Sequence, residues 1–190
     1  MFQKEDVPAT VELTAYTGVA AFNIGFGAKT ACSCFQLFPN APWRPELDGE
    51  DFRRLEEQWA NVVLLVVDEI SFIGKAFWAK MHHRLQQGRR RHFSEAALDP
   101  NGCIFGNLSM ILVGDFGQQE PIDDWSMCDN FSIRKECPDR LKKHWRAREQ
   151  GGLLLREFMV KTGNSEPEAI LLSNIHRSAE DLEWTASCMR

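Results

Sequence analysis

Residues 62–71 have the sequence VVLLVVDEIS, and this stretch decides the fold class. Its first six residues, Val62 to Val67, are all apolar and show no alternation with polar residues. A strand with this pattern must be buried on both faces, which is typical of the middle of a parallel sheet. The acids Asp68 and Glu69 follow directly, so the predicted strand ends at a pair of carboxylates.

The segments on either side extend this pattern into an α/β fold. A second apolar run, Leu108 to Val113, predicts another buried strand and is followed by Gly114-Asp115. Upstream, the alternating and β-rich segment Thr10 to Tyr16 predicts a third strand. Apolar residues at helical spacing predict helices over Glu50 to Ala60 and Lys75 to Arg91. Strands that alternate with helices indicate an α/β fold with a largely parallel sheet.

Acidic and amide side chains follow two of these strands, at the sheet edge where α/β proteins bind ligands. Asp68 is placed to hold hydrated Mg²⁺, and Glu69 is placed to orient or deprotonate a water. Asp115 and Gln118 follow the second strand, and a side-chain amide can bond to both a phosphate and a water. By themselves, the acids equally fit the first turn of a helix, and Gln118 fits a polar turn.

Composition excludes several classes of protein. With 44% hydrophobic and 26% charged residues among 190, the chain can bury a core and is not intrinsically disordered. No apolar stretch approaches the roughly 20 residues that span a bilayer, and the first residues lack the apolar core of a secretory signal. Six scattered cysteines fit a reducing compartment, and the nearest zinc candidate (Cys128, Cys137 and His144) lacks a C-x-x-C pair.

The basic residues are concentrated although the net charge is -5. Twelve of the 22 lysines and arginines lie in residues 80–92 and 134–148. Such runs are compatible with solvated helix faces and equally with an anionic partner. If the partner is nucleic acid, we expect Arg89, Arg90 and Arg91 to contact it.

Three segments together resemble a known family. TGVAAFNIG (Thr17 to Gly25), VVDEISFIG (Val66 to Gly74) and ILVGDFGQQEP (Ile111 to Pro121) are similar in sequence and order to motifs Ia, II and III of superfamily-1B DNA helicases of the petite-integration-frequency type, relatives of RecD-like helicases. The resemblance implies a RecA-like P-loop NTPase fold in residues 1–165, with a sheet incomplete at its N-terminal edge. Residues 166–190 would then begin a second RecA-like domain.

The resemblance also implies roles for individual residues in nucleotide chemistry. Asp68 matches the acid that holds Mg²⁺, and Glu69 matches the acid that activates the hydrolytic water. Gln118 matches the glutamine that senses the γ-phosphate, with Asp115 in support. Arg177 matches the motif IV arginine that reaches the γ-phosphate from the second domain, where it would stabilise transition-state charge.

Other matched residues lie on the DNA side. Thr17 and Gly18 match the motif that contacts the DNA backbone through a hydroxyl and main-chain amides, and Thr30 and Ser33 match a following T-x-x-S element. The resemblance thus implies an ATP-dependent, 5′-to-3′ DNA helicase that uses ATP and Mg²⁺ on single-stranded DNA or DNA junctions. It further implies roles in DNA repair, recombination and telomere maintenance, in the nucleus or mitochondrion of a eukaryote.

The largest departure from the family is the absence of a phosphate-binding loop, G-x-x-x-x-G-K-[ST]. The segment Gly25 to Thr30 (GFGAKT) ends in Lys29-Thr30, but the two positions that require glycine are Asn23 and Ala28. We therefore expect that Lys29 is not a phosphate ligand. We also expect a truncated or degenerate helicase copy that does not hydrolyse ATP as an isolated chain.

Smaller departures occur within the motifs. Cys32 stands where the family has histidine, Gln119-Glu120-Pro121 replaces Leu-Pro-Pro, Ser178 replaces glutamine, and two extra residues separate Gly25 from Thr30. Two alternatives to a helicase remain open. One is an inactive remnant that binds single-stranded nucleic acid. The other is a metal-dependent phosphoesterase, in which several carboxylates must converge on shared metals; its candidates are Asp68, Glu69, Asp115, Asp123 and Asp124.

Overall fold

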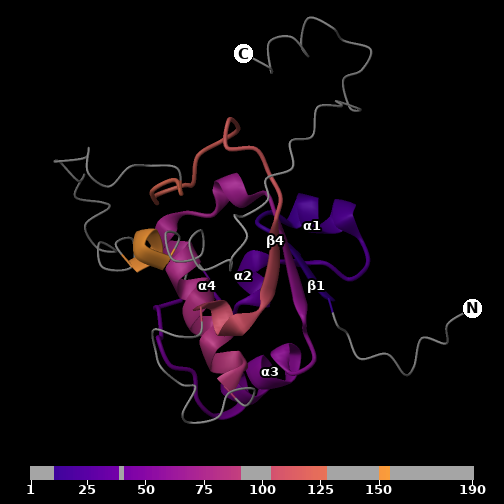
Figure 1. Ribbon diagram of the computed structural model, residues 1–190, viewed down its shortest axis with the longest axis vertical. Helices are drawn as coiled ribbons and strands as arrows, with labels where there is room; N and C mark the ends of the chain where they lie inside the picture. The colour runs from indigo at the N-terminus through magenta and orange to yellow at the C-terminus, as the bar shows by residue number, and fades with distance from the viewer. Residues whose placement is uncertain (1–10, 39–40, 91–103, 128–149, 155–190) are drawn as a thin grey trace, which may run out of the picture. The chain divides into compact units, whose positions relative to one another are not determined.

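Four parallel strands form one sheet in the order β2-β1-β3-β4 (Figure 1). They are β1 (Val11–Ala15), β2 (Lys29–Thr30), β3 (Leu64–Asp68) and β4 (Ser109–Leu112). The computed structural model describes residues 11–38, 41–90, 104–127 and 150–154. The expected α/β fold with a largely parallel sheet is confirmed.

Helices and short 3-10 turns connect the strands. They are α1 (Gly18–Ile24), α2 (Ala31–Cys34), α3 (Gly49–Trp59), η1 (Ile70–Phe72), α4 (Lys75–Gly88) and η4 (Ile104–Asn107). The predicted helices over Glu50 to Ala60 and Lys75 to Arg91 are confirmed with small shifts at their ends. The second domain expected over residues 166–190 lies outside the described residues.

Threonines begin both short helices that follow β1 and β2. The side chain of Thr17 accepts a hydrogen bond from the Ala20 N–H at 3.2 Å, and that of Thr30 accepts one from the Ser33 N–H at 3.2 Å. These are N-caps, which satisfy amides that lack a partner in the first turn of a helix. The strand ends are thereby tied to α1 and α2.

A carboxylate distant in the sequence caps α4. Asp124 Oδ2 accepts hydrogen bonds from the N–H groups of Ala76 and Phe77, at 2.9 and 3.2 Å. Gly74 precedes the helix, and a Cβ there would lie 2.3 Å from the Asp124 side chain, so only glycine allows this approach. The segment after β4 is thus fixed to the start of α4.

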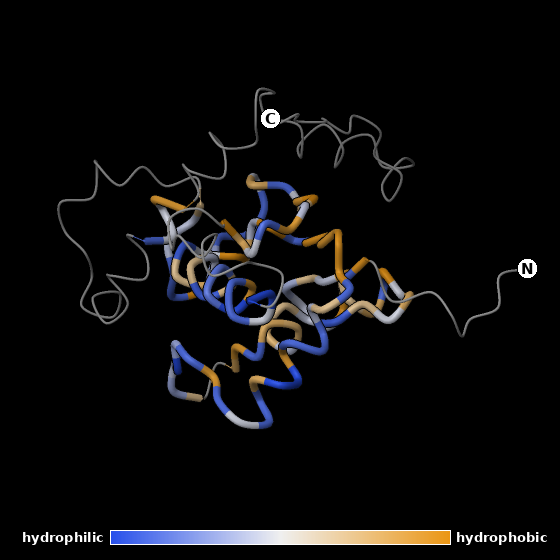
Figure 2. The backbone as a smooth tube through the Cα atoms, turned by 60° about the horizontal axis from the view of Figure 1, so that its bottom comes forward, coloured by the Kyte–Doolittle hydropathy of each residue, from blue (hydrophilic) through white to orange (hydrophobic). Residues whose placement is uncertain are grey.

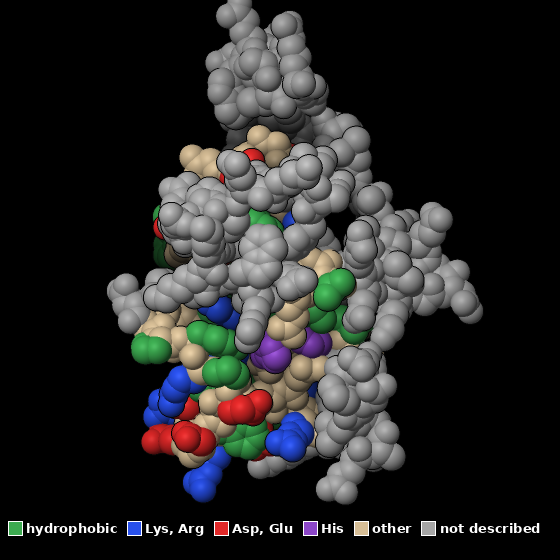
Figure 3. Space-filling view, turned by 90° about the vertical axis from the view of Figure 1, so that its left-hand side faces the viewer, with side chains coloured by type: hydrophobic (Ala, Val, Ile, Leu, Met, Phe, Trp, Pro, Cys, Tyr) green, Lys and Arg blue, Asp and Glu red, His purple; other side chains and the backbone are tan. Residues whose placement is uncertain are grey.

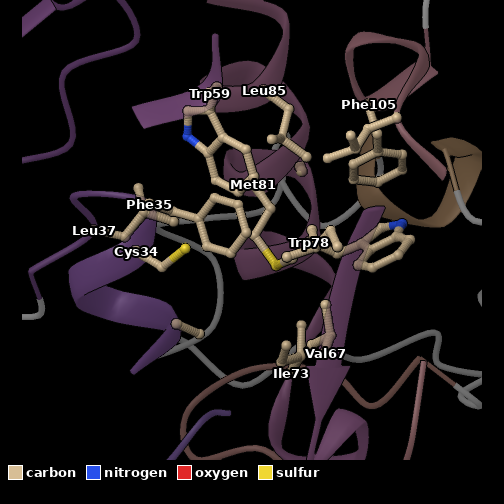
Figure 4. Packing of buried hydrophobic residues seen from close by; sticks show 14 of the residues in the cluster. Cys34, Phe35, Leu37, Trp59, Val67, Ile73, Trp78, Met81, Leu85 and Phe105 are labelled. Carbon is tan, nitrogen blue, oxygen red and sulfur yellow. The ribbon is translucent and has the colours of Figure 1, made fainter. Parts of the chain in front are cut away.

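Aromatic residues of α3, α4 and η4, together with Phe35 directly after α2, fill the core. Phe35 stacks on Trp59 with ring centroids 5.4 Å apart, and Trp78 packs on Phe105 at 4.4 Å. Figure 4 shows Met81 between these two pairs. All five side chains are 1% exposed or less. Burial of such side chains contributes about 2–3 kcal/mol each.

The described sheet has an apolar edge at β4. The strand nearest the N-terminus, β1, lies inside the sheet between β2 and β3. Beyond β4, the structure describes no further strand, and Ile111 and Val113 are 49% and 39% exposed. A strand apolar on both faces is typical of a sheet interior, so this edge agrees with a partial RecA-like sheet. The exposed apolar edge therefore lies at β4 rather than at the N-terminal strand.

Candidate functional site

The carboxyl ends of β1, β3 and β4 meet at one edge of the sheet. Ala15 pairs with Asp68, and Val67 pairs with Leu112, so the residues that follow these strands lie at the same edge. The sequence-based placement of Asp68, Glu69 and Asp115 at this edge is confirmed. Thr17 joins them from the end of β1.

Glu69 has an unusual backbone conformation, with φ 55° and ψ 43°. This left-handed region costs a non-glycine residue on the order of 1 kcal/mol and is frequent at functional sites. The Ile70 N–H donates to the Val113 oxygen at 3.0 Å, and the Val113 N–H donates to the Val67 oxygen at 2.8 Å. The bend at Glu69 is thus held by hydrogen bonds on both sides of it.

Two backbone amides orient the acidic pair. The Thr17 N–H donates to Glu69 Oε2 at 3.0 Å, and the Glu69 N–H donates to Asp68 Oδ1 at 2.8 Å. Both side chains are half-buried. Glu69 Oε1 and Asp68 Oδ2 receive no hydrogen bond from the described residues, so they are available for a water or a cation.

Thr17–Gly18 and Thr30–Ser33 lie side by side. A Cβ on Gly18 would be 4.0 Å from the Thr30 Cγ2, so the beginnings of α1 and α2 lie close together. Each threonine hydroxyl accepts a hydrogen bond from a nearby amide N–H, and its own O–H can still donate to another group. The structure therefore brings together the four residues expected on the DNA side.

Asp115 and Gln118 form an exposed turn after β4. Asp115 Oδ1 accepts a hydrogen bond from the Gly117 N–H at 2.8 Å, and the Gln118 N–H donates to the Asp115 carbonyl at 3.1 Å. Gly114 precedes the turn, and a Cβ there would lie 2.8 Å from the Ile70 nitrogen. Glycine thus lets the chain leave β4 directly against the bend at Glu69.

Lys29 is engaged in an ion pair away from this edge. Its Nζ lies 2.8 Å from Glu12 Oε1, and Glu12 is only 8% exposed. Glu12 stands near the start of β1, at the other end of the strand from Thr17. This pairing supports the expectation that Lys29 is not a phosphate ligand.

The expected contact between Arg89 and nucleic acid is wrong. Arg89 is 9% exposed, and its guanidinium donates to the carbonyls of Trp59, Val62 and Gly106. Burial lowers the pKa of Arg89. Arg90 is exposed, whereas Arg91 lies outside the described residues.

Arg84 is also buried and makes its hydrogen bonds within the fold. It is 2% exposed and donates to the carbonyls of Arg44 and Pro45 at 2.8 and 3.0 Å, with its guanidinium 4.5 Å above the Trp43 ring. Burial lowers its pKa to about 10. Among the described side chains on the face shown in Figure 3, basic and acidic groups are intermixed. Within residues 80–90, Arg84 and Arg89 are thus buried and Arg90 is exposed, so the arginines of this segment do not form one solvated basic face.

The carboxylates proposed for a phosphoesterase do not converge. The Asp124 carboxylate accepts hydrogen bonds from two amides at the N-terminus of α4. Within the described ranges, no group of three or more histidine, cysteine or acidic side chains is placed to hold a metal ion. The zinc candidate (Cys128, Cys137 and His144) and Arg177 lie outside these ranges. The described part of the chain thus gives no support to a multi-metal centre.

An aromatic pocket that sequence reasoning missed lies beside Thr17. Its volume is about 150 Å³, and its lining includes Tyr16, Phe72, Phe77 and Lys80. Tyr16 stacks on Phe72 with centroids 5.7 Å apart and meets Phe77 edge-on at 5.8 Å. Burial raises the pKa of Tyr16. These residues come from three separate segments, so no local pattern in the sequence signals the pocket.

None of the helices in the described part of the chain is both long and apolar enough to cross a membrane. Hydrophobic and hydrophilic residues instead alternate in short runs along the backbone (Figure 2).

Comparison with known proteins identifies one family. Residues 4–135 match the family model for the PIF1-like helicase. Among solved structures, Pif1 helicase from Bacteroides in complex with ADP-AlF3 and ssDNA is 26% identical over 62% of this chain and 25% of that chain, with a TM-score of 0.45. Pif1 helicase from Candida albicans is 27% identical over 59% of this chain and 23% of that chain, with a TM-score of 0.44.

The chain spans about a quarter of the length of these solved helicases. No curated protein sequence is significantly similar to it.

Proposed function

The chain belongs to the PIF1-like helicase family, and from this membership we propose that it forms part of an ATP-dependent DNA helicase. The proposal assigns residues 1–165 to the first RecA-like domain and residues 166–190 to the start of a second. It extends to 5′-to-3′ movement on single-stranded DNA or DNA junctions. Roles in repair, recombination and telomere maintenance, in the nucleus or mitochondrion, belong to the same proposal.

On the nucleotide side, we assign the sheet edge to the γ-phosphate end of bound ATP. Asp68 would hold Mg²⁺, and this fits because Mg²⁺ in such sites takes one or two carboxylates, with water and phosphate oxygens as its other ligands. Glu69 would hold the attacking water at Oε1, the oxygen that Thr17 leaves unbonded. Gln118, supported by Asp115, and Arg177 would contact the γ-phosphate. Bound Mg²⁺ would supply a charge that stabilises the transferring phosphoryl group.

The residues assigned to ATP lie at its γ-phosphate end, and no residue of this chain is assigned to the α- or β-phosphate. The 190 residues contain no G-x-x-x-x-G-K-[ST] loop, and the nearest candidate lysine, Lys29, is paired with Glu12. The site of this chain is thus half of a nucleotide site.

On the DNA side, we assign the strand backbone to the paired helix starts. The hydroxyls of Thr17, Thr30 and Ser33 and the amide of Gly18 would be the donors, which bind phosphates without regard to base sequence. Arg90 and Arg91 follow α4 and would add charge to the contact. Binding through such contacts should weaken steeply as salt is raised.

The observation that carries the proposal is the hydrogen bond from Thr17 to Glu69. It joins the segment assigned to DNA directly to the acid assigned to the hydrolytic water. A displacement of Thr17 by bound DNA would therefore reposition the Glu69 carboxylate, which is the relationship that a DNA-dependent motor requires.

The absence of the phosphate loop favours a second candidate, an inactive remnant that binds single-stranded nucleic acid. Both candidates predict DNA binding, so nucleotide binding separates them. Equilibrium binding of a fluorescent ATP analogue with Mg²⁺ should be weak but measurable, and Asp68→Asn should reduce it. If no binding is detected at millimolar Mg²⁺, the remnant is the better description.

The DNA assignment is tested by fluorescence anisotropy with a labelled oligothymidylate. We expect the double variant Arg90→Ala/Arg91→Ala to weaken binding at low salt. It should also reduce the slope of log affinity against log salt by about 0.7 for each phosphate that the variant no longer neutralises. Arg53→Ala, at an exposed arginine of α3, is the matched control. If the wild-type chain does not bind the strand at low salt, the DNA assignment fails.

The nucleotide assignment is tested by ATP hydrolysis. With no lysine to contact the β- and γ-phosphates, the purified chain should hydrolyse ATP at background rates with or without DNA. Robust hydrolysis that Glu69→Gln abolishes would show that another residue replaces the missing lysine.

A further inference from the structure

Two adjacent residues that follow β1 contact the segment that carries Glu69. The Thr17 N–H donates a hydrogen bond to Glu69 Oε2 at 3.0 Å. The Tyr16 ring stacks on the Phe72 ring, with centroids 5.7 Å apart and planes within 12° of parallel. Phe72 is the last residue of η1 and lies three residues after Glu69. The end of β1 is therefore attached to one short segment at two points, one polar and one aromatic.

The donor of the polar contact belongs to the peptide unit between Tyr16 and Thr17. A peptide unit is planar, so the position of the Tyr16 Cα and the rotation of that plane decide where the Thr17 N–H points. A contact that fixes Tyr16 in place therefore also directs the Thr17 N–H. The Tyr16 side chain is thus one rigid unit away from the hydrogen bond to Glu69.

The acceptor is attached to the Phe72 ring in a similar way. The Phe72 N–H donates to the Glu69 carbonyl at 3.0 Å, which closes the 3-10 turn of η1. Glu69 has the left-handed backbone described above, with φ 55°, and a non-glycine residue keeps this conformation only where the surrounding structure holds it. The turn that ends at Phe72 is part of that surrounding structure.

A third ring contacts Tyr16 from α4. Phe77 meets Tyr16 edge-on with centroids 5.8 Å apart, and the Phe77 N–H donates to Asp124 in the first turn of α4. Stacked and edge-on aromatic pairs prefer defined ring positions, whereas burial of apolar surface in general is non-directional. The two neighbouring rings therefore fix the Tyr16 ring between η1 and α4.

We propose that Tyr16 is a positioning residue for Glu69: its stack on Phe72 directs the Thr17 N–H to Glu69 Oε2 and so fixes the carboxylate assigned to the hydrolytic water. The inference rests on the proposed function and deepens it, since it adds a side chain that acts on Glu69 through Thr17. In this role Tyr16 contacts neither the nucleotide nor the DNA.

The test measures hydrogen exchange at the Thr17 amide by NMR, in the full chain without nucleotide or DNA. Rates are expressed as protection factors, because the side chain before an amide changes its intrinsic exchange rate. An aromatic pair changes a local opening equilibrium by about 2-fold to 12-fold. Tyr16→Ala removes two such pairs and should lower the protection of Thr17 by about fivefold or more. Tyr16→Phe keeps both pairs and should keep the protection.

A double-variant cycle distinguishes positioning from general destabilisation. If Tyr16 acts through the hydrogen bond to Glu69, its removal has little effect once the acceptor is gone. In the Glu69→Ala background, we therefore expect Tyr16→Ala to lower the protection of Thr17 by less than about twofold, a non-additive result. Two independent effects would multiply instead.

Phe52→Ala is the matched control, because Phe52 is also a half-buried aromatic residue packed against the core but lies in α3. It should lower the protection of the β3 amides, which exchange through global unfolding, without a separate effect at Thr17. Phe72→Leu removes the stack but keeps most of the apolar volume, and it should reproduce the effect of Tyr16→Ala. It also replaces Tyr16→Ala in the cycle if that variant does not fold.

Three results would overturn the proposal. They are unchanged protection of Thr17 in Tyr16→Ala or Phe72→Leu, a loss no larger than that of the β3 amides, and a loss that multiplies fully with that of Glu69→Ala. The measurement involves no nucleotide or DNA, so its failure leaves the proposed function standing. Failure to bind the ATP analogue and the oligothymidylate would instead count against the proposed function, and the effect of Tyr16 on the hydrogen bond between Thr17 and Glu69 would stand.

Discussion

The backbone N–H of Thr17 donates a hydrogen bond of 3.0 Å to Glu69 Oε2, although 52 residues separate the two in the sequence. Thr17 also caps α1, so the carboxylate and the helix start share one residue. The parallel pairing of β1 with β3 makes this contact possible, since Ala15 lies directly opposite Asp68. A contact at the sheet edge thus links the segment proposed to contact DNA with the acid proposed to hold the hydrolytic water.

Removal of the Glu69 acceptor should expose the Thr17 amide. We expect Glu69→Ala to speed hydrogen exchange at Thr17 by about tenfold, because a hydrogen bond to a charged group contributes about 1.5 kcal/mol. Glu69→Gln keeps an acceptor oxygen and should change the rate much less. Exchange measured by NMR at the single amide checks this, and equal rates in wild type and Glu69→Ala would mean that the bond does not persist in solution.

Arg89 should contribute to the free energy of unfolding, whereas Arg90 should not. Arg89→Met leaves the carbonyls of Trp59, Val62 and Gly106 without a donor, and it should lower the free energy of unfolding by about 3 kcal/mol. Arg90→Ala, at an exposed position, should change it by less than about 0.5 kcal/mol. Urea unfolding of both variants gives the comparison, and similar values for the two would contradict the internal role of Arg89.

Asp124 should stabilise the start of α4. Asp124→Ala removes the acceptor for the Ala76 and Phe77 amides, so we expect a loss of about 1–2 kcal/mol in the free energy of unfolding. Asp124→Asn keeps an acceptor oxygen without the charge and should lose less. Asp123→Asn, at the adjacent exposed carboxylate, serves as the control in the same urea titration. If Asp123→Asn lowers the free energy of unfolding as much as Asp124→Ala, the effect comes from changing the loop and not from the cap of α4.

The sheet and its acidic edge could be predicted because their signals are local and strong. Val62 to Val67 is apolar without interruption, and the acids that follow it occupy a position defined by the strand itself. By contrast, β2 has two residues and α2 has four, too few for any periodic pattern. Lys29–Thr30 forms a strand because β1 offers it a partner, and this pairing depends on tertiary structure.

Arg89, expected to contact nucleic acid but buried in the fold, shows a different limit of prediction from sequence. Clustered charges in a sequence indicate basic composition but not which way a side chain points. A signal was nevertheless present, because Arg89 is spaced eleven, eight and four residues from Trp78, Met81 and Leu85, which is the helical period of the buried face of α4. The left-handed backbone of Glu69 had no such signal, since it results from hydrogen bonds to β4 that form only in the folded sheet.

His82 should make the stability of the fold sensitive to acid. This side chain is 4% exposed, and its Nδ1 accepts a hydrogen bond from the Phe105 N–H at 3.0 Å. Burial, with a smaller contribution from His83, lowers the pKa of His82 to about 4 from its usual 6.5. In the unfolded chain His82 takes up its proton at the higher pH, so protonation favours unfolding.

The free energy that neutral His82 contributes should therefore be complete above pH 6.5, and it should be lost progressively as the pH falls to 4. The full loss is about 3 kcal/mol, from about 1.4 kcal/mol for each pKa unit. Urea unfolding at several pH values should show wild type losing this amount relative to His82→Gln, in which no proton binds at this position. Carboxylates that titrate in both proteins cancel in the difference, and His83→Gln, which removes only the smaller contribution, should lose slightly less stability than wild type. If wild type and His82→Gln lose stability in parallel between pH 7 and 4, His82 is not buried in its neutral form.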